Sequence, residues 1–281
     1  MRALTAMFVT ATALLAVSAC SKPADTASAP KTAAASPAAA QASASTSQIA
    51  PPFNLKRSSA TVEIDIALPA IPYGANAAAR IRTVMEEEAK KFEQDAGTQA
   101  AEMKTEGIEM VMPFSLQVGA EISMASPEAV SLLYSWSEFQ GGAHPNTNFT
   151  SDTFDPKTGE TITLDSLFGP GFVTSPSGKT LAAALCTDLK ARRAVRLKEA
   201  GIDIMDTECP ALEGLAWTLA PGTIAGKAAG FIFHLDAYAI GSYAEGPYYG
   251  LVPLSVFEAA LTPARKGLFA GTPKPLVDPI N

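Results

Sequence analysis

The sequence predicts an α+β fold, in which an antiparallel sheet is covered by two main helices. Two long helical patterns stand apart, with several strand patterns between and after them, and this order is typical of α+β proteins. Most of the strand patterns alternate apolar and polar residues, as expected for an antiparallel sheet with one buried face. The chain has 281 residues, of which 47% are hydrophobic. It is therefore long enough for one large domain or two small ones.

The first two elements are a strand and a long helix. Residues 61–68 alternate apolar residues such as Val62 and Ile64 with Glu63 and Asp65, which predicts a strand. Residues 76–103 repeat apolar side chains at helical spacing and are followed by Gly107. This pattern predicts a long amphipathic helix.

Strands dominate the middle of the chain. Residues 114–124 and 130–139 both alternate strongly between apolar and polar side chains, and each predicts a strand with one buried face. Further strands are expected at 147–154 and 161–164. They flank the sequence Asp-Pro-Lys-Thr-Gly at 155–159, which favours a hairpin turn.

The second main helix is expected at 178–200. Leucines recur along it at helical spacing, Ser177 is a candidate N-cap, and Gly201 follows its end. The remaining elements are short: three strands and one helix, expected at 215–219, 230–235, 251–254 and 255–261.

The N-terminus has the three parts of an export signal. Arg2 supplies the positive start, residues 4–15 are apolar, and small residues at 17–19 precede Cys20. We interpret 1–19 as a signal peptide and Cys20 as a lipid-modified first residue, carrying acyl chains such as palmitate. The alternative is an ordinary cleaved signal with a chance cysteine. Ser21 after the lipid site favours the outer membrane, facing the periplasm.

A tether is expected between the lipid and the folded part. Ala, Ser, Thr and Pro fill 24 of the 30 positions from 21 to 50, and such a segment buries too little apolar surface to fold. We interpret 20–59 as lipidated cysteine and tether, and 60–281 as the folded region. Its expected parts are 60–127, 128–262 and a tail at 263–281.

The other two cysteines suggest one disulfide. Of three cysteines in the chain, Cys186 and Cys209 remain once Cys20 is assigned to lipid. Since export leads to an oxidising compartment, we expect these two thiols to be bridged. Two separate buried thiols are the alternative.

Two long segments carry a resemblance to a known family. The first is GGAHPN at 141–146, followed by FTSDTFDPKTGETITLDSLF; the second is FIFHLDAYAIGSYAEGPYYGLVPLS at 231–255. Together they resemble the extracytoplasmic domain of RsiV-type anti-sigma factors. That domain is also the accessory domain of PdaC-type peptidoglycan deacetylases and occurs in lipoproteins. The resemblance covers roughly 60–262 and implies a non-catalytic module that binds a partner at the cell envelope. In the RsiV branch of the family the ligand is lysozyme.

The candidate contact residues lie in two loops. His144 follows two glycines that permit unusual backbone angles, and four of the six tyrosines fall within twelve positions among glycines and a proline. Such loop tyrosines offer large contact area at small entropic cost. The candidate partner-binding residues are His144, Asn146, Tyr238, Ser242, Tyr243, Glu245, Tyr248 and Tyr249. Alternatively, His144 stabilises its own turn, and two or three of the tyrosines cover the edge of the core.

Catalysis is not indicated by any familiar pattern. The chain has two histidines, too few and too far apart for a zinc site of the usual kind. His234 is interpreted as structural. No Gly-x-Ser-x-Gly sequence is present. The alternatives left open are a glycan hydrolase that uses two of Glu138, Glu213 and Glu245, and a structural envelope scaffold. We expect no catalytic residues, no metal and no cofactor.

The net charge indicates which class of partner the chain favours. At −7 the chain disfavours nucleic acid as a partner and favours a basic protein. A lysozyme-like muramidase is the leading candidate, and peptidoglycan is the other.

Overall fold

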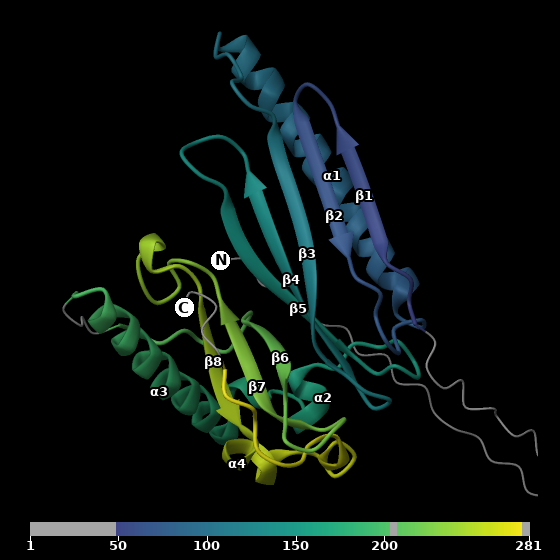
Figure 1. The fold of residues 1–281 in the computed structure, drawn as a ribbon, viewed down its shortest axis with the longest axis vertical. Coiled ribbons are helices and arrows are strands. Elements are labelled where there is room, and N and C mark those ends of the chain that lie inside the picture. Colours follow the sequence, from purple (N-terminus) through teal and green to yellow (C-terminus); the bar gives the residue numbers. More distant parts are fainter. Residues whose placement is uncertain (1–48, 203–206, 277–281) are drawn as a thin grey trace, which may run out of the picture. The chain divides into compact units, whose positions relative to one another are not determined.

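The computed structural model describes residues 49–202 and 207–276. Here the chain forms two sheets, each with one long helix beside it (Figure 1), so the predicted α+β class with two main helices is confirmed. The predicted signal peptide, Cys20 and most of the predicted tether lie outside the described residues.

The first sheet has five strands in chain order: β1 (Phe53–Ser58), β2 (Val62–Leu68), β3 (Phe114–Ala125), β4 (Val130–Phe139) and β5 (Asn146–Phe154). All neighbours are antiparallel except β2 and β3, which are parallel. The expectation of an antiparallel sheet therefore fails at this one pair. The reason is that a helix connects these strands and returns the chain to the end where β2 began.

That helix, α1 (Ala78–Thr105), packs on one face of the sheet. Its buried residues recur three or four positions apart: Ile81, Met85, Ala89, Phe92 and Ala96. They share a hydrophobic core with the inward residues of β2, β3 and β4. Because this spacing follows the helical period, the sequence pattern was sufficient to predict the buried face.

The second sheet is antiparallel and has three strands, β6 (Ala216–Pro221), β7 (Ala228–Leu235) and β8 (Tyr248–Pro253). Helix α3 (Pro176–Glu199) packs against it through a leucine stripe. A Cβ atom at Gly250 of β8 would clash with Leu185 and Leu189 of α3. The glycine therefore lets this helix approach the strand closely.

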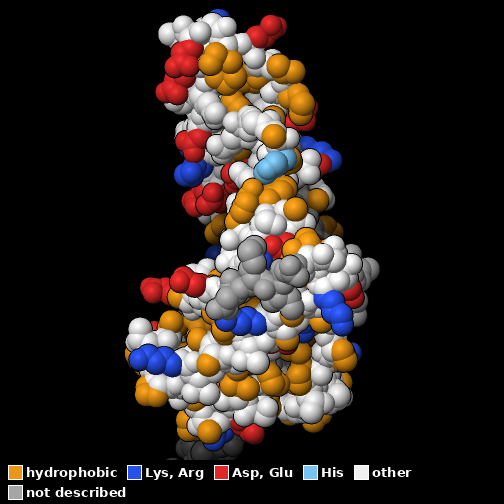
Figure 2. Space-filling model, turned by 90° about the vertical axis from the view of Figure 1, so that its left-hand side faces the viewer, with side chains coloured by type: hydrophobic (Ala, Val, Ile, Leu, Met, Phe, Trp, Pro, Cys, Tyr) orange, Lys and Arg blue, Asp and Glu red, His pale blue; other side chains and the backbone are white. Residues whose placement is uncertain are grey.

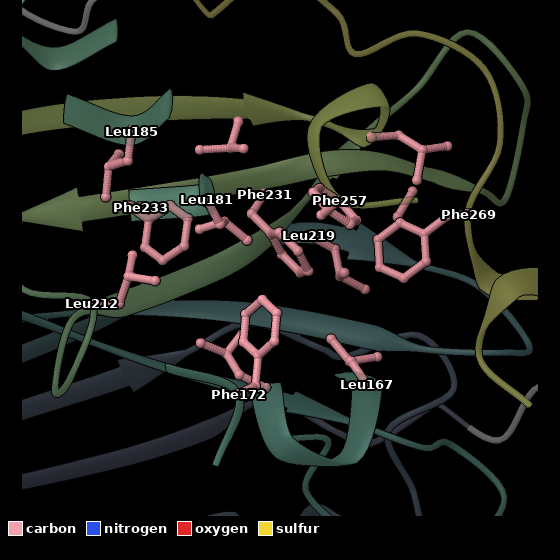
Figure 3. Close-up of a cluster of buried hydrophobic side chains, with 14 of the residues drawn as sticks. Leu167, Phe172, Leu181, Leu185, Leu212, Leu219, Phe231, Phe233, Phe257 and Phe269 are labelled. Carbon is pink, nitrogen blue, oxygen red and sulfur yellow. The ribbon is translucent and has the colours of Figure 1, made fainter. Parts of the chain in front are cut away.

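Aromatic rings fill the second core (Figure 3). Phe231 is fully buried, and its ring lies 4.6 Å from that of Phe257 and 5.6 Å from that of Phe269 between centroids. Short helices α2 (Leu164–Phe168) and α4 (Leu254–Phe257) contribute further side chains. Phe269 belongs to the segment expected to be a tail, which instead packs on this core.

Serine hydroxyls of the first sheet bind the backbone of β6. Ser123 Oγ donates to Leu219 O at 2.8 Å, and Leu219 N donates to Ser131 Oγ at 3.0 Å. Trp217 N donates to Ser151 Oγ at 2.9 Å. The polar face of the first sheet is thus covered by a strand of the second.

Several boundaries differ from the sequence prediction. Strand β1 lies inside the range assigned to the tether, where its alternation is too short and polar to stand out. Of the strand expected at 161–164, Thr161 forms one bridge to Phe154 before α2 begins. Helix α3 is capped by Ser175 rather than Ser177, since Pro176 is suited to the first helical turn.

The predicted disulfide between Cys186 and Cys209 is present, with the Cα atoms 5.4 Å apart. It links α3 to the segment before β6. Replacing both cysteines by serine should lower the free energy of unfolding by about 3 kcal/mol, because the unfolded chain regains the entropy of an open loop. Urea denaturation of the oxidised protein and the double variant measures this difference. An unchanged midpoint would contradict a stabilising role for the bridge.

Candidate functional site

Aromatic side chains from two loops far apart in sequence meet at the surface. The rings of His144, in the β4–β5 loop, and Tyr243, in the β7–β8 loop, stack with centroids 4.0 Å apart and planes inclined by 21°. Tyr243 also donates its hydroxyl to Pro145 O at 3.2 Å. The Tyr238 ring lies 5.5 Å from that of Tyr243. We call His144, Tyr238 and Tyr243 the aromatic patch.

The patch is accessible to a partner. Tyr238 is 65% exposed and Tyr243 is 36% exposed. Figure 2 shows a histidine at the surface with hydrophobic side chains beside it. Tyr238 has a positive φ of 72°, which is uncommon for a bulky residue and is tolerated where the surrounding structure imposes it. The loop backbone therefore keeps this ring exposed to solvent, at some conformational cost.

Glu245 lies next to the patch, but its carboxylate accepts hydrogen bonds from other groups of the protein. Arg193 of α3 donates to its two carboxylate oxygens at 2.8 and 3.2 Å, and the Glu245 side chain is only 11% exposed. The Ser242 backbone and the Tyr248 hydroxyl donate to the same carboxylate, both at 2.8 Å. The hydrogen bond from Arg193 holds the pKa of Glu245 down at about 2.

This arrangement differs from the expectation that Glu245 is one of the partner-binding residues. Its charge is neutralised by an arginine 52 residues away, and its oxygens are occupied. The hydrolase alternative also loses one of its three candidate carboxylates. Sequence reasoning missed Arg193, although the Ser-x-x-Glu spacing of Ser242 and Glu245 is a capping signal that was available.

The remaining tyrosines serve packing. Tyr248 is 1% exposed, and the Arg196 guanidinium lies 3.9 Å from the centre of its ring. Burial raises the pKa of Tyr248 to about 12. Tyr249 is half-buried, with its ring 5.9 Å from Phe149 and 5.2 Å from His234. The expectation that some rings cover the core edge therefore describes Tyr248 and Tyr249, and we leave Tyr248 out of the contact surface.

Two other expected residues stay at the surface. Asn146 is exposed at the start of β5, where it pairs with Glu138 of β4. Ser242 is exposed, and its hydroxyl lies 3.2 Å from Glu245 Oε1. Both flank the patch.

His234 has a structural environment. It is buried, and its Nε2 atom lies 2.9 Å from Thr218 Oγ1. Burial lowers the pKa of His234 to about 4. The imidazole is therefore neutral at physiological pH.

Comparisons with known proteins bear on both halves of the chain. Residues 55–147 match the family model described as deacetylase PdaC. The resemblance to the PdaC-type domain is thereby confirmed for the segment that contains α1, β2 to β4 and the His144 loop. No curated protein matches the sequence significantly.

A solved structure shares the fold. A DUF3298 family member from Bacteroides fragilis superposes with a TM-score of 0.52 at 16% identity, covering 79% of this chain and 96% of its own. A DUF3298 family protein from Pseudomonas aeruginosa has a TM-score of 0.48 at 16% identity, covering 79% and 97%.

Between 49 and 202 and between 207 and 276, no three His, Cys, Asp or Glu side chains gather as a metal site would require. Within the same ranges no helix is both long and apolar enough to cross a bilayer.

If Glu245 is structural, Glu245→Ala should lower the free energy of unfolding by roughly 3 kcal/mol at pH 7, because Arg193 is left buried without its counter-charge. A carboxylate with a depressed pKa stabilises the fold above its unfolded pKa, and this stabilisation is lost as pH falls through the folded value. Wild type and variant should therefore converge between pH 4.5 and about 2.

Denaturant titrations across this pH range measure the effect. Lys56→Ala is the matched control, since the Lys56–Asp65 pair is exposed and its loss should change stability by about 0.5 kcal/mol or less. A Glu245→Ala variant as stable as this control would show that the buried pair contributes little.

Proposed function

We propose that this chain is a lipid-anchored module of the bacterial envelope that acts by binding a partner through the aromatic patch. The stacking of His144 on Tyr243 carries the proposal, because it joins the two loops into one exposed surface. Tyrosine and histidine rings combine apolar area with polar edges, a composition enriched in contact surfaces.

The partner we favour is a basic protein of the lysozyme-like muramidase class. Two features support this choice: the resemblance stated above and the net charge of −7, which attracts a cationic protein over a distance. Glu245 adds little to that attraction, because Arg193 neutralises it locally. Peptidoglycan is the competing ligand, and its sugar rings would stack on the same side chains.

The test is binding of hen egg lysozyme and of purified peptidoglycan by the wild type and by a Tyr238→Ala/Tyr243→Ala variant. Removing two central rings should weaken binding of the true partner at least tenfold. Ile224→Ala is the control, since Ile224 is exposed in the β6–β7 loop and its loss should leave affinity unchanged.

Each outcome decides between the candidates. Lysozyme binding that the double variant loses would support the muramidase, and sedimentation with peptidoglycan that it loses would support the wall. Absence of wild-type binding to either at micromolar concentration, or equal binding by the variant, would overturn the role of the patch.

The anchor is tested separately. Cys20→Ser should move the protein from the membrane to the soluble fraction, since acyl chains supply most of the membrane affinity. Mass spectrometry of the N-terminal peptide should find lipid on Cys20 in the wild type. An unmodified Cys20, or a variant that stays in the membrane, would contradict this part of the proposal.

A further inference from the structure

The two sheets have four edge strands, and side chains of the protein close three of them. On β5 the Asp236 carboxylate accepts from Phe149 N at 2.7 Å, and on β8 the Asp188 carboxylate accepts from Leu251 N at 2.8 Å. On β6 two backbone N–H groups donate to serine hydroxyls of the first sheet. A side chain in such a position occupies the donor that an added strand would need.

The fourth edge strand, β1, is open, and Figure 1 shows it as the outermost strand of the first sheet. Ser59 N donates to Val62 O at 2.8 Å, which places the hydrogen-bonded pairs between β1 and β2 at the odd-numbered residues of β1. The backbone N–H and C=O groups of Asn54, Lys56 and Ser58 therefore point away from β2. Among the residues that the structure describes, no group bonds to these backbone atoms.

An acidic groove of about 580 Å³ lies beside this edge. The lining residues that matter are Leu55 and Arg57 of β1, and Glu86, Glu87, Lys90 and Glu93 of α1. No residue of β2 lines the groove, so it opens on the side away from that strand. Arg57 and Glu93 pair at 2.7 Å, which leaves two carboxylates against one ammonium group. In the described ranges, Glu86 and Glu87 belong to no ion pair.

We propose that β1 is a docking edge for an extended, basic segment of another protein, which adds to the first sheet as a further strand. The backbone of the segment pairs with the open N–H and C=O groups at positions 54, 56 and 58. Side chains of a strand alternate between the two faces, and neighbouring strands lie about 4.8 Å apart. Every second side chain of the segment therefore projects over the groove, where Lys or Arg meets Glu86 and Glu87.

The same charges disfavour a second copy of this chain as the occupant. Antiparallel pairing of β1 with its copy is two-fold symmetric and brings both α1 helices to the same face of one joined sheet. Glu86 and Glu87 of one copy would then face the same residues of the other, and like charges repel. A basic segment replaces this repulsion by attraction. The inference does not depend on the aromatic patch.

The probe is a synthetic peptide of about eight residues that alternates lysine and valine and has both ends blocked, titrated into the protein by isothermal calorimetry. Lys56→Pro should weaken binding at least about tenfold, because proline removes the outward N–H and is tolerated on an edge strand. Lys56→Ala is the matched control. It also lacks the lysine but keeps the N–H, so it should bind at least as tightly as the wild type.

The groove is tested by its charges. Glu86→Gln/Glu87→Gln should weaken binding of the peptide about 3- to 10-fold, because two carboxylates that attract its lysines are neutralised. Glu213→Gln/Glu258→Gln removes the same net charge at exposed positions elsewhere and should bind as the wild type does. A peptide with glutamate in place of lysine should bind at least about tenfold more weakly than the lysine peptide.

The backbone pairing is also tested on the unchanged protein. A lysine–valine peptide methylated at its amide nitrogens cannot donate to β1 and should not bind, whereas Tyr238→Ala/Tyr243→Ala should bind the unmodified peptide as the wild type does. No binding of that peptide at about 1 mM, equal affinities of Lys56→Pro and Lys56→Ala, or equal binding of the methylated peptide would overturn the docking edge. A wild-type dimer that Lys56→Pro dissociates would overturn the choice of a basic partner.

Discussion

The hydrogen bonds between serines of the first sheet and the backbone of β6 are the interaction on which the arrangement of the described residues depends. Leu219 is fully buried, and both its N–H and its carbonyl are satisfied by Ser131 and Ser123. A buried backbone group without a partner costs about 1–3 kcal/mol, so these hydroxyls are required wherever β6 meets the first sheet. Ser131 also shares a hydrogen bond with Thr153 at 2.7 Å, which fixes its position.

The aromatic patch is a consequence of that junction. His144 belongs to a loop of the first sheet and Tyr243 to a loop of the second, and a further contact from Phe149 N to Asp236 Oδ1 at 2.7 Å ties β5 to the segment after β7. The Arg193–Glu245 pair then attaches the tyrosine loop to α3. The exposed rings therefore lie on a loop anchored from beneath, which lowers the entropy that binding would cost.

The patch exposes rings whose polar edges are largely satisfied within the protein, such as the Tyr243 hydroxyl on Pro145, and it suits a broad surface. The segment similar to deacetylase PdaC contains the His144 loop of the patch.

What the sequence by itself determined is the set of features that depend on neighbours along the chain. The alternation at 130–139 predicted β4 at its observed bounds, and the leucine stripe predicted the buried face of α3. The tertiary structure decided which polar groups are buried and which residues cover them. A period of two separates the serine face of β4 from the apolar face, yet it does not reveal that β6 covers the serines. Glu245 and Tyr248 likewise read as surface residues until Arg193 and Arg196 of α3 are placed against them. The physical reason is that periodicity is a local property, whereas the partner of a buried charge or hydroxyl is set by residues that are distant in the chain.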